Sequence, residues 1–216
     1  MILFGSSLSP FARKVLAFAS EKGIEMDLQP TGFPNHSPEF LAASPFRKMP
    51  ALQDGEFTLA DSSAIVHYLE AKFPQPALIP AEPELLGKTI WFEEFADTIA
   101  CAAVEKIFMN RIVKPRFMGM EGNEEEALAC ERESLPRMLD YLETTVPEEG
   151  GYLVGDRLTL ADIAVASPFV NFEHTRTEID AARYPRTVAY VSQILARPSF
   201  APVIERERAM LAPQAA

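Results

Sequence analysis

A proline-rich segment separates two parts of this chain that carry different hydrophobic patterns. Residues 74–83 contain four prolines, and proline interrupts a continuous helix because it lacks the backbone N–H and its ring clashes with the preceding turn. Before this segment, short apolar runs alternate with stretches of helical periodicity; after it, strand patterns largely disappear. The sequence therefore predicts an α/β domain of residues 1–77, a linker of residues 78–86 and an all-helical domain of residues 87–216.

The first domain is expected to begin with a βαβ unit. Residues 2–4 form a short apolar run, as a buried strand does, and residues 9–22 carry apolar residues at helical spacing. The helical pattern closes at Gly23, and residues 24–28 then alternate like a second strand.

A short helix, a hairpin and a longer helix complete this domain. The short helix begins at Ser37, and residues 51–59 form a hairpin whose Asp54-Gly55 pair suits a two-residue turn that needs positive φ. Residues 62–73 follow with an amphipathic helical pattern. The resulting order of strand, helix, strand, helix, strand, strand and helix is a thioredoxin-like layout.

The second domain is predicted to contain helices only. Their apolar patterns cover residues 85–113, 123–146, 159–174, 185–196 and 200–211, with breakers at Pro115, Gly119, Gly150-Gly151 and Pro198. Pro136 and Pro168 lie inside helical patterns, where we expect kinks or helix starts. Thr159 and Asp162 have the spacing of a capping box, which starts a buried helix.

Charge and cysteine content narrow the range of partners. The formal net charge is -11, and most of the acidic excess lies after residue 77. An acidic surface repels phosphate backbones and anionic lipid headgroups, so we expect no nucleic acid and no membrane partner. Cys101 and Cys130 are far apart in the sequence and have no histidine near them, so the sequence predicts no metal site and no disulfide framework.

The chain shows no targeting or membrane-spanning pattern. Met1 leads directly into the predicted strand at residues 2–4, and no uninterrupted apolar run approaches about 18 residues. We therefore expect a cytoplasmic protein.

Four motifs occur along the chain in a characteristic order. They are Ser9-Pro10-Phe11, residues 37–41 followed by Pro45-Phe46 and Met49-Pro50, the Asp61-Ser62-x-Ala64-Ile65 segment, and Gly155-x-x-x-Thr159-x-Ala161-Asp162. This combination resembles the cytosolic glutathione S-transferase family, and residues 37–52 are most similar to its phi class and bacterial, serine-type relatives. The resemblance covers essentially the whole chain. It implies a thioredoxin-like glutathione-binding domain followed by an all-helical domain that forms the pocket for an electrophile.

The resemblance assigns the catalytic role to the hydroxyl of Ser9. Glutathione attacks as its thiolate, and a hydroxyl that donates a hydrogen bond at a helix N-terminus favours that anion. Lowering the thiol pKa by about two units needs about 2.7 kcal/mol, which one charge-assisted hydrogen bond and the helix dipole can supply. Ser9 could instead only cap the helix, and Ser6 and Ser7 in the same turn are competitors. Because serine cannot form a mixed disulfide, conjugation is favoured over thiol–disulfide exchange.

The resemblance also implies which residues bind glutathione, the expected co-substrate. These residues are Ser9, Phe11, His36, Lys48, Met49, Pro50, Asp61 and Ser62. The backbone of Met49, before a proline that is cis in the family, would bind the cysteinyl part, and Asp61 with Ser62 would bind the γ-glutamyl end. Asp61 stands where many relatives have Glu, so its reach to the ligand amine is one methylene shorter. His36 and Lys48 are candidates for the glycyl carboxylate, with a solvated loop histidine as the alternative for His36.

The second substrate is expected to be a small hydrophobic electrophile. The resemblance implies a pocket between the domains, with Phe108, Arg111 and Ile112 of the long helix as candidate lining residues; an apolar stripe of this kind is also common in helix cores. Phe46 resembles the hydrophobic key that inserts into a partner subunit in several classes, which implies a homodimer. Local packing onto the short helix is the alternative for Phe46.

Two other functions are compatible with this fold. One is glutathione-dependent cis–trans isomerisation of maleyl-type compounds, which the zeta class performs with a Ser-Ser-Cys run; the corresponding residues here, Ser9-Pro10-Phe11, argue against it. The other is a non-catalytic binding protein that retains the fold with a degenerate sulfur site. The intact Ser9, Pro50, Asp61 and Ser62 argue against this second alternative.

Overall fold

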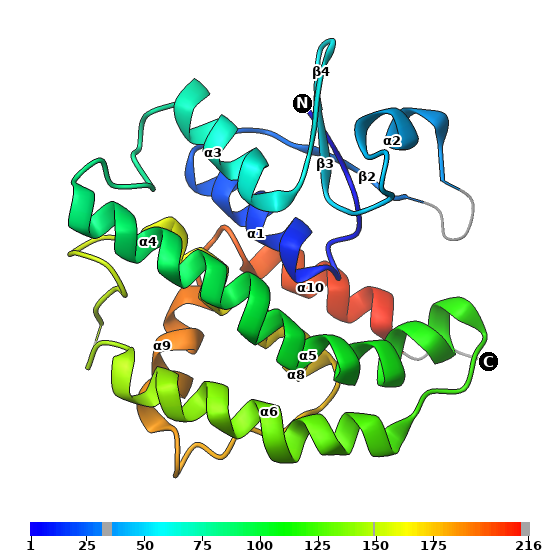
Figure 1. The fold of residues 1–216 in the computed structure, drawn as a ribbon, viewed down its shortest axis with the longest axis vertical. Helices are drawn as coiled ribbons and strands as arrows, with labels where there is room; N and C mark the ends of the chain where they lie inside the picture. The colour runs from blue at the N-terminus through cyan, green and yellow to red at the C-terminus, as the bar shows by residue number, and fades with distance from the viewer. Residues whose placement is uncertain (32–35, 149, 213–216) are drawn as a thin grey trace. The chain divides into compact units, whose positions relative to one another are not determined.

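The computed structural model describes residues 1–31, 36–148 and 150–212 (Figure 1). The chain divides into two units, Met1–Ile79 and Pro80–Ala216. The break falls within the proline-rich segment. The first helix of the second unit, α4 (Pro83–Phe95), begins inside the range 78–86 that the sequence predicts as linker.

The first unit is built on a four-stranded sheet with the strand order β2-β1-β3-β4. Its strands are β1 (Ile2–Phe4), β2 (Asp27–Gln29), β3 (Ala51–Asp54) and β4 (Phe57–Ala60), and its helices are α1 (Pro10–Glu21), α2 (Pro38–Ala43) and α3 (Ser62–Lys72). β1 pairs in parallel with β2 and antiparallel with β3, which pairs antiparallel with β4. The element order is the predicted one, so the predicted thioredoxin-like fold is confirmed.

Helices cover this sheet through two separate groups of apolar side chains. Successive side chains of a strand point to opposite faces, and Phe4 packs with Phe40 and Ala43 of α2 and with Ala51 of β3. α1 and α3 pack against each other, and α3 contacts β3. The fully buried residues of these two helices include Val15, Phe18, Ile65 and Leu69. Burial of each large apolar side chain contributes roughly 1.5–3 kcal/mol, so packing holds the three helices in fixed places on the sheet.

The second strand lies a few residues later than predicted. β2 covers Asp27–Gln29 rather than residues 24–28. The difference arises because the backbone N–H of Ile24 still donates to the carbonyl of Ala19 at the end of α1, so the chain becomes extended only after this turn.

The hairpin turn consists of Gly55 and Glu56 rather than the predicted Asp54-Gly55 pair. Asp54 pairs with Phe57 across the hairpin, which leaves only the two residues between them in the loop. Gly55 has a φ of +62°, whereas Glu56 does not have positive φ. Positive φ at the first turn residue alone is the φ pattern of a type II′ turn, which glycine adopts without steric cost.

The described residues of the second unit form helices and no strand, which confirms the predicted all-helical second domain. The elements are α4 (Pro83–Phe95), η1 (Ala96–Ala100), α5 (Cys101–Phe108), η2 (Met109–Met118), α6 (Glu124–Thr145), α7 (Leu160–Ala166), α8 (Phe169–His174), α9 (Pro185–Leu195) and α10 (Ala201–Leu211). Elements α4 to η2 follow one another without a break, and η1 and η2 are π-helical.

Three prolines of the helical unit have different effects on the helices that contain or adjoin them. Pro115, predicted to break the long helix, lies inside η2, because π-helical turns accommodate an altered hydrogen-bond ladder; the helix ends only at Gly119, whose φ is +62°. Pro168 interrupts the pattern predicted over residues 159–174, so that α7 and α8 are separate helices. α6 continues through Pro136.

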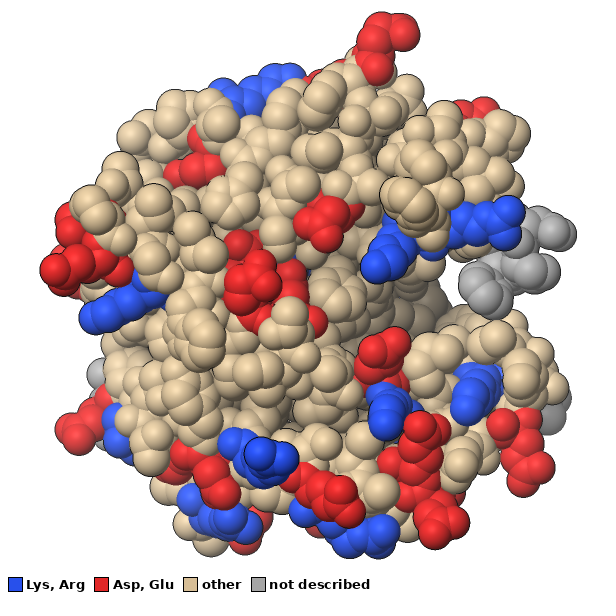
Figure 2. Space-filling view, in the orientation of Figure 1, with Lys and Arg blue, Asp and Glu red and all other residues tan. Residues whose placement is uncertain are grey.

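Three features of the structure concern the predicted partners: the surface charge, the length of the apolar helices and the grouping of possible metal ligands. Figure 2 shows Lys and Arg side chains interspersed with Asp and Glu on the face in view. Within residues 1–31, 36–148 and 150–212, no helix has the length and apolar character needed to cross a bilayer. The same residues contain no group of three or more His, Cys, Asp or Glu side chains arranged to hold a metal ion.

The start of α7 contains the predicted capping box. The buried carboxylate of Asp162 accepts a hydrogen bond from the backbone N–H of Thr159 at 2.8 Å. It also accepts from the backbone N–H of Leu153 at 2.8 Å and from the Tyr190 hydroxyl at 2.7 Å. Burial raises the pKa of Asp162, and these donors oppose the shift. Asp162 thus joins the start of α7 to the preceding loop and to α9.

Replacing Asp162 with Ala is expected to lower the free energy of unfolding by roughly 2–4 kcal/mol, because the donors of Leu153, Thr159 and Tyr190 lose their acceptor together. Urea denaturation measures this change. Asp156→Ala removes an exposed aspartate from the same loop and is expected to change the free energy by less than about 0.5 kcal/mol. Equal effects of the two substitutions would contradict the structural role of Asp162.

Candidate active site

The register of the sheet brings three chain segments to one edge of the first unit. Phe4 of β1 pairs with Ala51 of β3, and Ala51 pairs with Ala60 of β4. The three residues therefore lie in one row across the sheet. The turn that starts at Gly5, the Met49-Pro50 loop and the N-terminus of α3 all adjoin this row.

Gly5 allows the first turn to pack closely on the Met49-Pro50 loop. A Cβ atom built on Gly5 would lie 3.5 Å from the Cβ of Ala12 and 3.8 Å from the Cβ of Met49. The start of α1 and the loop before β3 are thus neighbours. The Met49-Pro50 peptide bond is cis, as in the family that the sequence resembles.

Ser9 lies at the N-cap of α1. Its Oγ accepts a hydrogen bond from the backbone N–H of Ala12 at 3.5 Å, and its φ and ψ of -76° and 124° are those of an N-cap residue. Because the oxygen accepts this bond, the hydroxyl proton remains available to donate. The capping alternative and the catalytic role are therefore compatible at Ser9.

The competing serines occupy different positions in the turn. Ser6 Oγ accepts from the backbone N–H of Leu8 at 3.3 Å, and Ser7 is buried. Neither residue is the N-cap of α1, where the unpaired amide groups and the helix dipole raise the positive potential. This difference favours Ser9 as the residue that interacts with an anion.

Asp61 and Ser62 form the N-terminus of α3. The carboxylate of Asp61 accepts from the backbone N–H groups of Ser63 at 2.9 Å and Ala64 at 3.1 Å. These bonds hold Asp61 in the left-handed region, with a φ of +82°. Ser62 is 3% exposed and lies in the first turn of α3. A serine at a helix N-terminus, where backbone N–H groups lack intrahelical partners, suits a site that binds an anionic group.

The loop that carries Met49 is fixed by Ser44. The buried hydroxyl of Ser44 donates to the carbonyl oxygen of Lys48 at 2.6 Å and accepts from the backbone N–H of Lys48 at 3.0 Å. In the described part of the chain, the backbone N–H and C=O of Met49 have no hydrogen-bond partner. Sequence reasoning did not identify Ser44, because a serine after a helix gives no sign of which loop group it will bind.

The other predicted glutathione-binding residues are placed less specifically. Phe11 is half-buried in the first turn of α1, and the side chain of Lys48 is exposed. The ring of His36 lies 4.9 Å from the ring of Phe40, between centroids. The structure thus brings Ser9, Met49, Pro50, Asp61 and Ser62 to one edge, whereas His36 packs on α2.

Arg111, a candidate for the electrophile pocket, is bound by two carboxylates of α6. Its guanidinium donates to Glu124 at 2.6 Å and to Glu131 at 2.6 Å, and also to the hydroxyl of Thr177 at 3.2 Å. Phe108 and Ile112 are 8% exposed. This network joins η2 to α6, so Arg111 has a structural role in the second unit, and its role toward a substrate stays a prediction.

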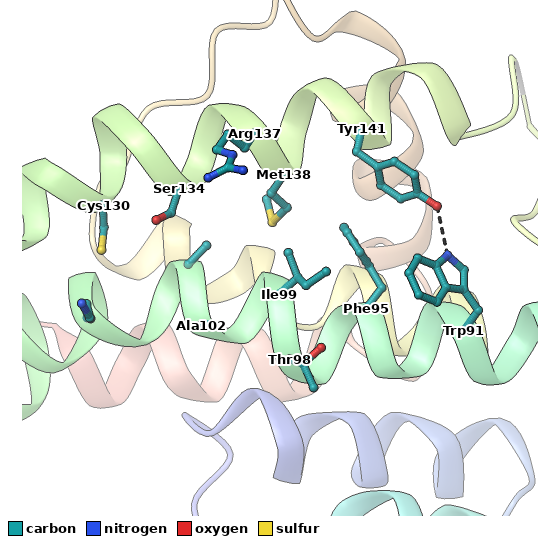
Figure 3. A pocket seen from close by; sticks show the side chains of 12 residues that line it. Trp91, Phe95, Thr98, Ile99, Ala102, Cys130, Ser134, Arg137, Met138 and Tyr141 are labelled. Carbon is teal, nitrogen blue, oxygen red and sulfur yellow. Dashed lines mark hydrogen bonds between the residues drawn. The ribbon is translucent and has the colours of Figure 1, made fainter.

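A groove of about 540 Å³ lies on the second unit, between α6 and the run of α4, η1 and α5 (Figure 3). Its lining residues are Trp91, Phe95, Thr98, Ile99, Ala102, Ala103, Lys106, Cys130, Ser134, Arg137, Met138 and Tyr141. At one end, the half-exposed Trp91 donates from Nε1 to the hydroxyl of Tyr141 at 3.0 Å. Most of these lining residues are apolar, and none of the three predicted electrophile-pocket residues is among them.

Among the large apolar side chains of residues 1–31, 36–148 and 150–212, Phe46 is the most exposed, with 88% of its surface accessible. The alternative that Phe46 packs locally onto the short helix is therefore wrong. A single exposed apolar side chain is common on protein surfaces, so a contact of Phe46 with a partner subunit stays a prediction.

Comparisons with known proteins agree with this geometry. Residues 3–77 match the family model "Glutathione S-transferase, N-terminal domain", and residues 108–207 match "Glutathione S-transferase, C-terminal domain". Glutathione S-transferase 3 of Zea mays is 31% identical over 92% of this chain and 90% of its own length. The chain belongs to the glutathione S-transferase family.

Two further comparisons describe the range of this family. The crystal structure of glutathione transferase F7 from Populus trichocarpa superposes with a TM-score of 0.81 at 27% identity, covering 94% of this chain and 97% of that one. A probable maleylacetoacetate isomerase of Vibrio cholerae is 30% identical over 93% of this chain and 94% of its own length. The predicted family and enzyme class are confirmed, and the phi-like subclass stays a prediction.

Replacing Arg111 with Met is expected to lower the free energy of unfolding by about 1–3 kcal/mol at neutral pH, because two carboxylates lose their cation. For Glu124, the bond from Arg111 lowers the pKa below its ordinary 4.5; for Glu131, burial acts to raise the pKa, but the bonds from Arg111 and Thr177 outweigh it. Because the pKa of each carboxyl is lower in the folded state than in the unfolded state, its ion pair contributes its full share to the free energy of unfolding above pH 4.5. That contribution is lost as the pH falls through the pKa of the folded state.

The difference between wild type and Arg111→Met should therefore shrink as the pH falls below 4.5, as measured by urea denaturation across pH. Arg206→Met, which removes an exposed arginine of α10, is the control and should show no such pH dependence. A difference that stays constant into the acid range would contradict the ion-pair explanation.

Proposed function

We propose that this enzyme conjugates glutathione to small hydrophobic electrophiles, with the hydroxyl of Ser9 stabilising the thiolate. The observation that carries the proposal is the N-cap position of Ser9, whose oxygen is bound to Ala12 while its proton is available. At this position the hydroxyl donates to sulfur in the positive potential of the first turn of α1. Lowering the thiol pKa by about two units needs about 2.7 kcal/mol, which is within the reach of these two interactions.

The remaining parts of glutathione match the groups along the same edge. The backbone N–H and C=O of Met49 can pair with the cysteinyl backbone as a short strand does. The carboxylate of Asp61 suits the γ-glutamyl ammonium, and the amide and hydroxyl of Ser62 suit the γ-glutamyl carboxylate. Lys48, exposed beside Met49, is the cation for the glycyl carboxylate.

Isomerisation of maleyl-type compounds is the second candidate activity. It is favoured by the likeness to the probable maleylacetoacetate isomerase of Vibrio cholerae, and it also begins with attack of the thiolate. Ser9-Pro10-Phe11 in place of a Ser-Ser-Cys run is the observation against it. Incubation with a maleyl-type substrate and glutathione decides between the activities, because an isomerase regenerates glutathione whereas conjugation consumes it.

The first test needs no choice of electrophile. Ultraviolet absorbance of the thiolate, followed against pH in glutathione mixed with excess protein, should show bound glutathione ionising about two units below the free thiol. Ser9→Ala is expected to remove most of this shift and to lower kcat by about 10- to 100-fold, because one hydrogen bond to the developing charge is lost. Glutathione binding should change little.

Ser6→Ala is the matched control, because it removes a hydroxyl of the same turn whose bond is to Leu8. Thermal unfolding separates the loss of the helix cap, about 1 kcal/mol, from the loss of activity. An unshifted thiol pKa in the wild type, or a full loss of the shift in Ser6→Ala, would rule out the role of Ser9.

We infer that a second copy of this chain is the partner of the exposed Phe46. In a two-fold dimer, Phe46 of each subunit would contact the other subunit. The groove lined by Trp91, Phe95 and Ile99 offers apolar side chains that could receive the ring. Both features are costly to leave in water, since burial of one phenylalanine contributes roughly 1.5–3 kcal/mol.

Phe46→Ala is expected to raise the dissociation constant of the dimer by at least about tenfold, because the contact occurs twice in a symmetric pair. Sedimentation velocity over a concentration series measures it. Phe57→Ala removes another exposed phenylalanine, on β4, and should leave the dissociation constant unchanged. A wild-type protein that remains monomeric at high concentration would refute the homodimer.

A further inference from the structure

Ser44 closes the exposed loop that leads from α2 to β3. It is 1% exposed, and its hydroxyl donates to the carbonyl oxygen of Lys48 at 2.6 Å and accepts from the backbone N–H of Lys48 at 3.0 Å. Residues 45–48 are all exposed, so packing in the core does not hold this loop. One hydroxyl thus pairs with both backbone groups of the residue before Met49.

The loop contains a backbone conformation that needs such support. Arg47 has a φ of +57°, in the left-handed region that residues with a Cβ atom rarely adopt. Its backbone N–H donates to the carbonyl oxygen of Ser44 at 2.9 Å, so the turn is closed once through the backbone of Ser44 and twice through its hydroxyl. An unfavourable φ persists only where surrounding bonds hold it. Loss of the hydroxyl would therefore let the loop leave the conformation that precedes Met49.

Met49 is the residue that this support orients for a ligand. Within residues 1–31, 36–148 and 150–212, its backbone N–H and C=O have no hydrogen-bond partner. Pro50, which follows, is buried next to the start of β3. Met49 is therefore anchored to the sheet on one side and held by Ser44 through Lys48 on the other. A backbone segment fixed on both sides loses little conformational entropy when a ligand pairs with it.

We propose that Ser44 is a positioning residue for the cysteinyl backbone of glutathione. Its hydroxyl holds Lys48 so that the N–H and C=O of Met49 are preorganised to pair with the C=O and N–H of the cysteinyl residue. The inference rests on the proposed function and adds to it a residue that touches neither the ligand nor the thiol. Ser44 acts on the affinity for glutathione, whereas Ser9 acts on the ionisation of the bound thiol.

A purely structural role of Ser44 at the end of α2 is the alternative. Ser44 is the C-cap of this helix, and its backbone N–H donates to the carbonyl oxygen of Phe40 at 2.7 Å. Ser44→Ala leaves that bond in place. Ser37, the N-cap at the opposite end of α2, provides a matched control, because its Oγ accepts from the backbone N–H of Phe40 at 3.2 Å. Ser37→Ala removes a serine hydroxyl from the same helix without removing a bond that closes the loop.

The test compares two ligands that differ in one hydrogen-bond donor. They are S-methylglutathione, whose blocked thiol removes any contribution of thiolate formation, and its analogue in which an ester oxygen replaces the cysteinyl amide N–H. In calorimetric titration of the full chain, the wild type is expected to prefer the amide ligand by about tenfold, which corresponds to about 1.4 kcal/mol. Ser44→Ala should weaken the amide ligand by about tenfold. The ester ligand, which uses only one backbone group of Met49, should weaken by about threefold, so that the preference falls to about threefold.

Two conservative variants keep the test valid if Ser44→Ala does not fold. Ser44→Thr retains the hydroxyl, and the φ of -131° at this position is compatible with a β-branched residue; it should keep the tenfold preference and bind within about threefold of the wild type. Ser44→Cys has a weaker donor of similar size and should lose about threefold for the amide ligand alone. Ser37→Ala should lower the melting temperature without changing the preference.

The pKa of the bound thiol is the readout that distinguishes Ser44 from Ser9. At saturating glutathione, the thiolate absorbance of Ser44→Ala should titrate with the same pKa as that of the wild type. A pKa that moves toward the value of the free thiol would overturn the assignment of Ser44 to affinity alone.

The remaining outcomes separate this inference from the proposed function. An unchanged affinity of Ser44→Ala for the amide ligand, or an equal weakening of both ligands, would overturn the role of Ser44 and leave the glutathione site intact. A wild type that binds both ligands equally would show that Met49 does not pair with the cysteinyl N–H, and would overturn the inference as well. A wild type that binds neither ligand would overturn the proposed function and this inference with it.

Discussion

The pairing of β3 with both β1 and β4 is the constraint on which the candidate active site depends. The register aligns Phe4, Ala51 and Ala60 in one row, and each of them is followed or preceded directly by a functional segment. Because a shift of one residue in a strand moves every side chain to the opposite face, the buried pair of Phe4 and Ala51 fixes this register through packing with α2. The hydrophobic core thereby sets the positions of polar groups that contribute nothing to it.

In the proposed mechanism, two helix N-termini supply the chemistry at this edge. Ser9 caps α1 and Asp61 caps α3, and both side chains accept bonds from backbone N–H groups that the helix leaves unpaired. The two caps have opposite consequences for a ligand. Ser9 is neutral and keeps a proton to donate to an anion, whereas Asp61 brings a charge that attracts an ammonium group. A zwitterionic γ-glutamyl end and a thiolate are the groups that such a pair of caps distinguishes.

The sequence predicted those parts of the fold and site that depend on local patterns. Helix α3 and the capping box at Asp162 follow from periodicity and from residue types at fixed spacing, and both are present. The turn at Gly55 was placed one residue early, because the pairing of Asp54 with Phe57 depends on the whole sheet. The contact of Ser44 with Lys48 and that of Arg111 with Glu131 join residues whose proximity arises only after folding. No local pattern reports them.

The charge of the whole chain sets a further condition for a ligand at this edge. In a chain with a net charge of -11, the long-range potential opposes the approach of a doubly carboxylated tripeptide. In the proposed site the exposed Lys48, next to Met49, is a local cation that offsets part of that repulsion, and its effect should weaken as salt is added.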